Sequence, residues 1–295
     1  MSEVIFLEYN VNPNDHKISD VIISLRMLGF LQISTSRNEQ ATMWSANKCV
    51  LLLSRKEYIP TGISGIGCNT DAPDGSIYCE TTGMNLVKDH NGFNIYTHNI
   101  ENFKKTYDKH FITIGDAGTS LPVDNIVGFV YKDVFKSNNI FNDELKFRKV
   151  KQTDNFTTTV CKNNRFNIVW DESNQTDTQI IDTIIIKTND IVDATAKLVS
   201  NGFNSEKISV ARRNEIISKV DKNPEAYPAK HVLNGWDFNL GGKPKSFVVE
   251  KRFENVLPNL DLILSRQHNH NGINTETLMY YSEIESDINE HARVH

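Results

Sequence analysis

The stretch Thr183-Ile-Ile-Ile-Lys187, followed by Asp190-Ile-Val-Asp-Ala-Thr-Ala-Lys-Leu-Val-Ser-Asn-Gly-Phe203, repeats a pattern found near the start of the chain. There, Ile5-Phe-Leu-Glu-Tyr-Asn-Val11 is followed by Ile18-Ser-Asp-Val-Ile-Ile-Ser-Leu-Arg-Met-Leu-Gly-Phe30. Each copy is a β-rich stretch, a polar turn and a short amphipathic helix that ends at Gly-Phe, with the same spacing from the first helical isoleucine to the glycine. This internal repeat predicts an architecture of repeated strand–helix modules.

The first copy also predicts how one module continues. Its helix, residues 18–28, carries apolar residues at helical spacing, and Gly29 is typical of a helix end. Residues 31–35 and 43–54 are rich in β-forming residues and are predicted as consecutive antiparallel strands. The predicted order of elements in one module is therefore strand, helix, strand and strand, and a fourth, closing strand is left open.

The rest of the first half predicts a second, less regular module. The stretch 63–68 is predicted to open it, and Pro73, Gly75 and Gly83 favour loops where its helix would stand. A further helix is predicted to end near His110.

The second half predicts two more modules, which begin at Asn125 and Asp182. The Gly- and Pro-containing segment 116–122 is the predicted linker between a domain of residues 1–115 and a domain of residues 122–295. The long stretch 212–244 in the last module is predicted to cover or enter a cavity.

The composition of the 295 residues is typical of a globular protein, with 39% hydrophobic and 23% charged residues. A net charge of -5 without a basic stripe argues against a nucleic-acid partner. No apolar run reaches the ~20 residues that a membrane span needs. The four cysteines lack the CxxC spacing of a zinc ribbon or redox pair. Because a strand-like run follows Met1 almost at once, we expect an unexported, cytoplasmic protein.

Four segments carry a family resemblance: Phe6-Leu-Glu-Tyr9 with its following module, Pro122-Val-Asp-Asn-Ile-Val-Gly-Phe-Val130, Asp182–Gly202, and Leu262–Asn269 with Thr275–Met279. They resemble the vicinal oxygen chelate superfamily of glyoxalases, bleomycin-resistance proteins and dioxygenases, and within it the hydroxyphenylpyruvate dioxygenase branch. The resemblance implies an α+β fold in which tandem βαβββ modules form two curved mixed β-sheets with helices packed outside. It also implies a divalent metal, held by His and Glu, that chelates two adjacent substrate oxygens or activates dioxygen.

Two ligand positions implied by the resemblance hold other residues in this chain. The dioxygenase branch has histidines where this sequence has Asn125 and Thr183. Asparagine is a weak ligand and threonine a poor one, so the usual His-His-Glu set is broken on two of three strands. We therefore assign no firm cofactor and expect no tightly held iron there, with Fe, Mn or Zn at a shifted site as the alternative.

A shifted metal site would use His268 with Glu276 or Glu283. Alternation along the preceding strand lets His268 face a cavity, and neutral imidazole suits all three metals. The alternative for His268 is a strand-end side chain bonded to water or backbone. Glu283 lies in an acidic stretch, where a solvated carboxylate is the simpler interpretation.

Ligand contacts other than His268 are predicted at Glu8, Asn125, Asp182 and Tyr281. Asn125 and Asp182 are candidates by position. Tyr281 belongs to an adjacent tyrosine pair, of which one should point inward, although core packing is the commoner outcome.

Glu8 stands out because it lies in mid-strand between apolar neighbours, where an unpaired carboxylate is costly. It is interpreted either as an acid in a cavity or as the ion-pair partner of Arg26 or Arg37.

Two functions of different class follow. Loss of the histidines favours a protein that binds a small oxygenated or aromatic molecule, as bleomycin-resistance proteins do. The four-module length favours a metal-dependent dioxygenase, lyase or isomerase. In both cases the expected partner is a small molecule, without nucleic acid or membrane, and the sequence leaves a homodimer open.

Overall fold

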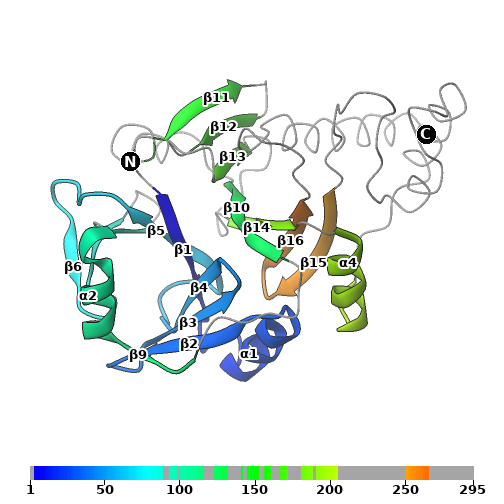
Figure 1. Ribbon diagram of the computed structural model, residues 1–295, viewed down its shortest axis with the longest axis horizontal. Coiled ribbons are helices and arrows are strands. Elements are labelled where there is room, and N and C mark those ends of the chain that lie inside the picture. Colours follow the sequence, from blue (N-terminus) through cyan, green and yellow to red (C-terminus); the bar gives the residue numbers. More distant parts are fainter. Residues whose placement is uncertain are drawn as a thin grey trace, which may run out of the picture.

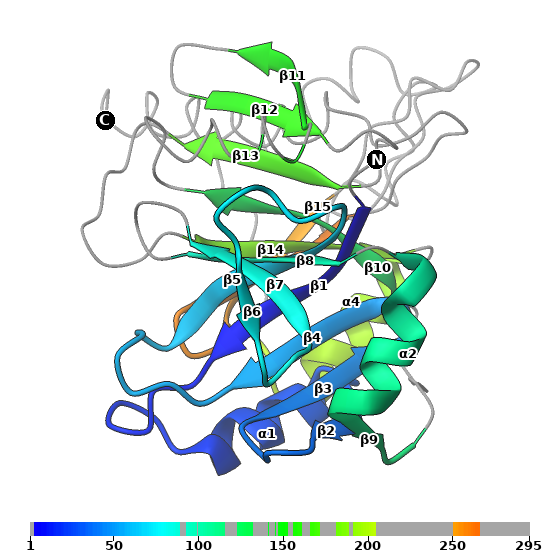
Figure 2. The same cartoon turned by 90° about the vertical axis from the view of Figure 1, so that its left-hand side faces the viewer.

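The computed structural model describes residues 3–88, 93–98, 100–115, 123–131, 141, 145, 147–152, 156–160, 166–171, 181–188, 191–204 and 250–265. Within these residues the chain forms two mixed β-sheets, one of nine strands and one of seven (Figure 1). Both sheets are curved, as the view turned by 90° shows (Figure 2). The predicted α+β class with tandem modules in two curved mixed sheets is confirmed, whereas the placement of all helices outside stays a prediction.

The nine-stranded sheet, here the first sheet, is built from the N-terminal half. Its elements in chain order are β1 (Glu3–Asn10), α1 (Ile18–Met27), β2 (Leu31–Ser36), β3 (Ala41–Ala46), β4 (Cys49–Ser54), β5 (Gly62–Asn69), β6 (Ile77–Cys79), β7 (Met84–Lys88), β8 (Asn94–His98), α2 (Ile100–His110) and β9 (Phe111–Thr113).

The strand order of the first sheet shows two modules joined through their first strands. The order is β6-β7-β8-β5-β1-β4-β3-β2-β9, so β1-β4-β3-β2 on one side has its counterpart in β5-β8-β7-β6 on the other. In each module the first strand runs parallel to the last, and the two first strands, β1 and β5, pair antiparallel. Residues 70–76, between β5 and β6, contain no helix, which confirms the predicted loop.

The seven-stranded sheet, here the second sheet, repeats this plan. Its elements are β10 (Val123–Tyr131), β11 (Arg148–Gln152), β12 (Phe156–Val160), β13 (Asn167–Asp171), β14 (Ile181–Thr188), α4 (Ile191–Ser200), β15 (Glu250–Leu257) and β16 (Leu260–Ser265). The order is β11-β12-β13-β10-β14-β16-β15, with β10 antiparallel to β14 and each of them parallel to the last strand of its own module.

The sequence repeat is also a structural repeat. β1–α1 and β14–α4 each open a module, and both helices end in the same hydrogen-bonded turn. The amide of Phe30 donates to the carbonyl of Leu25, and that of Phe203 to the carbonyl of Leu198. The preceding glycines have φ of 81° and 97°, which glycine adopts without steric cost.

One predicted strand is two strands in the structure. The stretch 43–54 divides into β3 and β4, which pair antiparallel around a turn at Asn47 and Lys48. Asn47 has φ 55°, a left-handed conformation that asparagine tolerates better than most residues. An apolar run on each side masks this turn in the sequence, and the division supplies the closing strand of the βαβββ module.

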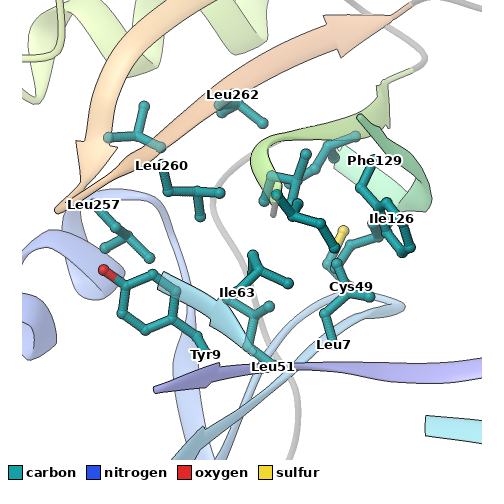
Figure 3. Close-up of a cluster of buried hydrophobic side chains, with 14 of the residues drawn as sticks. Leu7, Tyr9, Cys49, Leu51, Ile63, Ile126, Phe129, Leu257, Leu260 and Leu262 are labelled. Atoms are coloured by element: carbon teal, nitrogen blue, oxygen red, sulfur yellow. The ribbon is translucent and has the colours of Figure 1, made fainter. Parts of the chain in front are cut away.

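The two sheets share one hydrophobic core. Leu7, Tyr9 and Leu51 of the first sheet belong to the same buried cluster as Phe129 and Leu262 of the second (Figure 3). Asparagine side chains also donate across the seam: Asn47 to the carbonyl of Val123 at 2.9 Å, Asn201 to that of Met27 at 2.7 Å, and Asn259 to that of Thr61 at 3.0 Å. The predicted linker, 116–122, lies outside the described residues, and the domain division stays a prediction.

One gap between the described residues at the seam is too small for a ligand. An apolar gap of about 10 Å³ lies between the halves, lined by residues such as Leu28, Leu51, Ile184 and Leu257. That volume is close to the minimum for one water molecule, so this gap holds no ligand. No described helix is long and apolar enough to cross a membrane.

Tyr9 forms a hydrogen bond between the two halves of the chain. Its phenol is buried and donates to the carbonyl of Pro258, in the turn between β15 and β16, at 2.6 Å. We expect Tyr9→Phe to cost about 1–2 kcal/mol of unfolding free energy in urea, because it leaves a partly buried carbonyl without its donor. Tyr58→Phe, at a tyrosine that is 75% exposed, is the control and should stay near wild type.

The pH dependence gives an independent check on Tyr9. Burial raises the pKa of its phenol above the ordinary value of 10.0, so the folded chain keeps the proton that the unfolded chain loses above about pH 10. Stability from this group is therefore complete below pH 10 and falls as the pH rises further. Tyr9→Phe should lose less stability than wild type between about pH 10 and 11; an equal loss would contradict the assignment.

Candidate functional site

Alternation along β1 separates two environments. Leu7 and Tyr9 face the shared core, whereas Phe6 and Glu8 face the opposite side of the first sheet. That side holds a second apolar cluster, which includes Phe6 and Tyr96. Within it lies a polar group of Glu8, Lys56, Asn94 and Tyr96, here the Glu8 cluster, drawn from β1, the turn after β4, and β8.

Glu8 is fully buried, and three donors surround its carboxylate. The Lys56 ammonium lies 2.7 Å from Oε1 and the Tyr96 hydroxyl 3.0 Å from the same oxygen. The Asn94 amide donates to Oε2 at 2.7 Å. This arrangement meets the requirement that a buried charge be both paired and hydrogen-bonded.

The predicted partners of Glu8 were wrong, because the cation is Lys56. Arg26 is exposed on α1, and Arg37 donates to the carbonyls of Asp108 and Lys109. Lys56 was not predicted as the partner because it lies 48 residues from Glu8 in the sequence, just after the end of β4. No single residue spacing along the chain predicts that β1 and β4 are parallel neighbours.

Asn10 explains why Lys56 reaches Glu8. The Asn10 amide accepts from the backbone N–H of Lys56 at 2.8 Å and donates to the carbonyls of Lys56 and Ile59 at 3.0 and 2.7 Å. Asn10 is buried and lies two residues beyond Glu8 on β1. Two side chains of β1 therefore fix this turn: Asn10 binds its backbone, and Glu8 binds the ammonium of Lys56.

Two further features of the Glu8 cluster follow from its burial. Burial, followed by the charge of Glu8, raises the pKa of the Tyr96 phenol well above its ordinary value of 10.0, so this group stays a donor. Gly65 on β5 keeps the same place clear, because a Cβ there would lie 2.6 Å from the carbonyl oxygen of Asn94 and 2.9 Å from Oε2 of Glu8.

The second sheet positions the residues predicted on β10 and β14. Asn125 lies near the start of β10, between Val123 and Ile126, which pair with Thr188 and Ile186. Thr183 pairs with Val130, at the other end of the same strand pair. The two positions are about five residues apart along β10, roughly 16 Å. Side chains as short as asparagine and threonine cannot meet at one ion across that span.

Asp182 and Thr183 divide between the two faces of β14. The Thr183 hydroxyl is buried and donates to Oδ1 of Asp182 at 2.9 Å. Alternation places Asp182 on the side of Ile184 and Ile186, which belong to the shared core, and Thr183 on the opposite side. Only Thr183 therefore lies on the face away from the seam.

An ion pair lies beside Thr183 on that face. Asp261 of β16 is the direct cross-strand partner of Thr183. Its Oδ2 accepts from Nη2 of Arg252 at 2.7 Å, and its Oδ1 accepts from the backbone of Asn255 at 2.8 Å. Both side chains are partly exposed, at 22% and 18%. This pair was not predicted from the sequence, although the alternation of polar and apolar residues along β15 and β16 is a signal for it.

The remaining predicted site residues, His268, Glu276, Tyr281 and Glu283, lie outside the described residues. The described ranges contain no group of three or more His, Cys, Asp or Glu side chains that could hold a metal ion. A shifted metal site therefore stays a prediction.

Comparison with known proteins finds similarity by structure alone. No protein-family profile and no curated protein matches the sequence. A fusion protein of a xylose isomerase-like TIM barrel and a 4-hydroxyphenylpyruvate dioxygenase superimposes with a TM-score of 0.68 at 10% identity, over 94% of this chain and 51% of that one. A mutant 4-hydroxymandelate synthase from Streptomyces coelicolor gives a TM-score of 0.63 at 9% identity, over 94% and 95% of the two chains.

The chain shares the fold of these dioxygenase-fold proteins. It spans about half the length of the fusion protein and nearly all of the synthase. Identities of 9–10% carry the fold and not the site residues, so the chemistry has to be argued from the side chains.

Proposed function

We propose that this chain is a dioxygenase-fold protein that binds a small oxygenated or aromatic molecule in its C-terminal half, without the family's complete metal site. The observation that carries the proposal is the setting of Thr183. Its hydroxyl is already bonded to Asp182, and its neighbour across the sheet is the Arg252–Asp261 ion pair. On this face the hydroxyl of Thr183 and the ion pair beside it are the polar groups available to a ligand.

These groups suit recognition of an oxygenated molecule. A guanidinium next to a carboxylate offers directional donors to carboxylate or carbonyl oxygens of a ligand. The structural neighbours are named for 4-hydroxyphenylpyruvate and 4-hydroxymandelate, aromatic acids with two oxygen functions on adjacent carbons. An aromatic acid of this class is the ligand that we propose.

The residues at the ligand positions do not fit the His-His-Glu iron site implied by the fold. Asn125 and Thr183 offer an amide and a hydroxyl, which are weak ligands for iron. No reaction step is therefore assigned to a metal. The alternative function, a metal-dependent dioxygenase, lyase or isomerase, requires a shifted site such as His268 with Glu276 or Glu283.

Metal content and binding distinguish the two functions. We expect untagged protein to contain far less than one iron per chain, with little change in melting temperature on adding Fe(II), Mn(II) or Zn(II). 4-Hydroxyphenylpyruvate at a hundredfold excess over its dissociation constant should stabilise the metal-free protein by about 2.7 kcal/mol.

Near-stoichiometric iron in wild type, lost in His268→Ala, would overturn the binding proposal and support the enzyme. Failure of 4-hydroxyphenylpyruvate to stabilise the metal-free protein at millimolar concentration would reject this ligand class.

A further inference from the structure

The last strand of the first sheet, β9, has one edge that no described strand covers. It stands at the end of the strand order, next to β2 (Figure 2). The stretch Phe111-Ile-Thr-Ile-Gly115, which contains β9 and the two residues after it, has no charged residue and no proline. Charges and prolines are what usually protect a free edge, and an edge without them is a template for pairing with another strand.

The hydrogen bonds between β9 and β2 show which backbone groups face this edge. The carbonyl of His110 accepts from the amide of Arg37 at 2.8 Å, and the amide of Ile114 donates to the carbonyl of Ile33 at 2.8 Å. Opposite residues of an antiparallel pair alternate between hydrogen-bonded and non-hydrogen-bonded. Thr113 is one residue from Ile114, so its N–H and C=O point away from β2, toward the free edge.

Two apolar side chains lie beside these backbone groups and are left in solvent. Ile112 is 51% exposed and Ile114 is 59% exposed. Residues two apart on a strand point to the same face, so the two isoleucines share one face and Thr113 lies on the other. Phe111, by contrast, is buried in the second apolar cluster. The free edge therefore offers a backbone donor, a backbone acceptor and a pair of apolar side chains.

We propose that β9 pairs antiparallel with β9 of a second copy of the chain, about a twofold axis at Thr113. In this register the two Thr113 residues exchange two backbone hydrogen bonds. Ile112 of each copy lies opposite Ile114 of the other, in the closely spaced non-hydrogen-bonded pairs. A register centred on Ile112 would instead set Ile114 against His110 of the second copy and leave one apolar pair in place of two.

The dimer is weak because its interface is small. Two isoleucines and a short backbone edge from each copy bury far less than the ~800 Å² per partner of a standard interface. We therefore expect a dissociation constant on the order of 10–100 μM, as in transient complexes. The homodimer that the sequence leaves open acquires a specific surface in this way. The surface lies in the N-terminal half and does not depend on the ligand proposed for the C-terminal half.

The test is sedimentation velocity of the full chain from about 1 to 500 μM. We expect wild type to pass from monomer to dimer over this range. Ile112→Lys should weaken the dimer about tenfold or more, because symmetry removes both apolar pairs at once. The double variant Ile112→Lys/Ile114→Glu sets opposite charges across from each other in the register centred on Thr113, and should recover most of the affinity at low salt. In the register centred on Ile112 it would bring two like charges together.

Ile77→Lys is the matched control, because Ile77 is 71% exposed on β6, the strand at the other edge of the same sheet. This variant should dimerise like wild type. Hydrogen exchange gives a second readout: the amides of residues 111–115 should gain protection as the concentration rises, and those of residues 77–79 should not.

Three results would overturn the proposal. A wild type that stays monomeric at about 500 μM would leave the edge of β9 to a strand of another protein. A dimer that is weakened by Ile77→Lys and not by Ile112→Lys would place the contact at β6. A double variant that associates more weakly than Ile112→Lys would exclude the register centred on Thr113.

Discussion

Replacing Lys56 with methionine should lower the unfolding free energy by about 3–5 kcal/mol, which is a large part of the stability of an ordinary domain. The substitution keeps the length and apolar stem of the side chain but removes the ammonium 2.7 Å from Glu8. Glu8 is fully buried, so water cannot replace the lost cation. The measurement is denaturant unfolding of the full chain at neutral pH.

Two further variants separate the charge from the packing. Glu8→Gln combined with Lys56→Met removes both charges and should recover much of the loss, because the amide leaves no uncompensated charge in the sheet. Lys105→Met, at an exposed position on α2, should stay close to wild type. A Lys56→Met protein as stable as Lys105→Met would show that Glu8 does not depend on its lysine.

The sequence predicted the repeated part of the fold well because the signal is local. A β-rich stretch, a helix with apolar residues at helical spacing and a Gly-Phe end are all contained in about 25 residues. The same signal appears at β1–α1 and at β14–α4, and the helix ends of the two copies are identical in their hydrogen bonding. The missing helix of the second module was predictable for the same reason, from Pro73 and Gly75.

The candidate site was predicted less well because its contacts are long-range. Glu8 was recognised as unusual from its neighbours alone, but its partners lie 48, 86 and 88 residues away. Which of several distant polar residues reaches it depends on β1 being next to β4 and β5, with β8 one strand further. That order is a property of the whole sheet. The same holds for Thr183, whose neighbour Asp261 is brought to it by the pairing of β14 with β16.

Gly65 shows how a residue without a side chain shapes the site. The expected result for Gly65→Ala is a loss of about 3 kcal/mol in unfolding free energy. The added methyl would lie 2.6 Å from the backbone oxygen of Asn94, on the neighbouring strand β8, and 2.8 Å from its Cβ. Because β5 and β8 are paired along their length, the backbone cannot move away without breaking the ladder.

The sign of the change in unfolding free energy for Gly65→Ala distinguishes a hindered glycine from an unhindered one. At an unhindered position in a strand, alanine is more favourable than glycine by about 0.5–1 kcal/mol, because it restricts the unfolded chain. Gly115→Ala, where a Cβ would meet nothing within 4 Å, is the control and should be neutral or stabilising. If thermal unfolding shows Gly65→Ala to be stabilising as well, the close approach of β5 to Asn94 and Glu8 is wrong, and the geometry of the Glu8 cluster fails with it. A loss confined to Gly65→Ala would instead mean that the bare backbone of β5 is what lets a buried carboxylate, an amide and a lysine meet on one face of the first sheet.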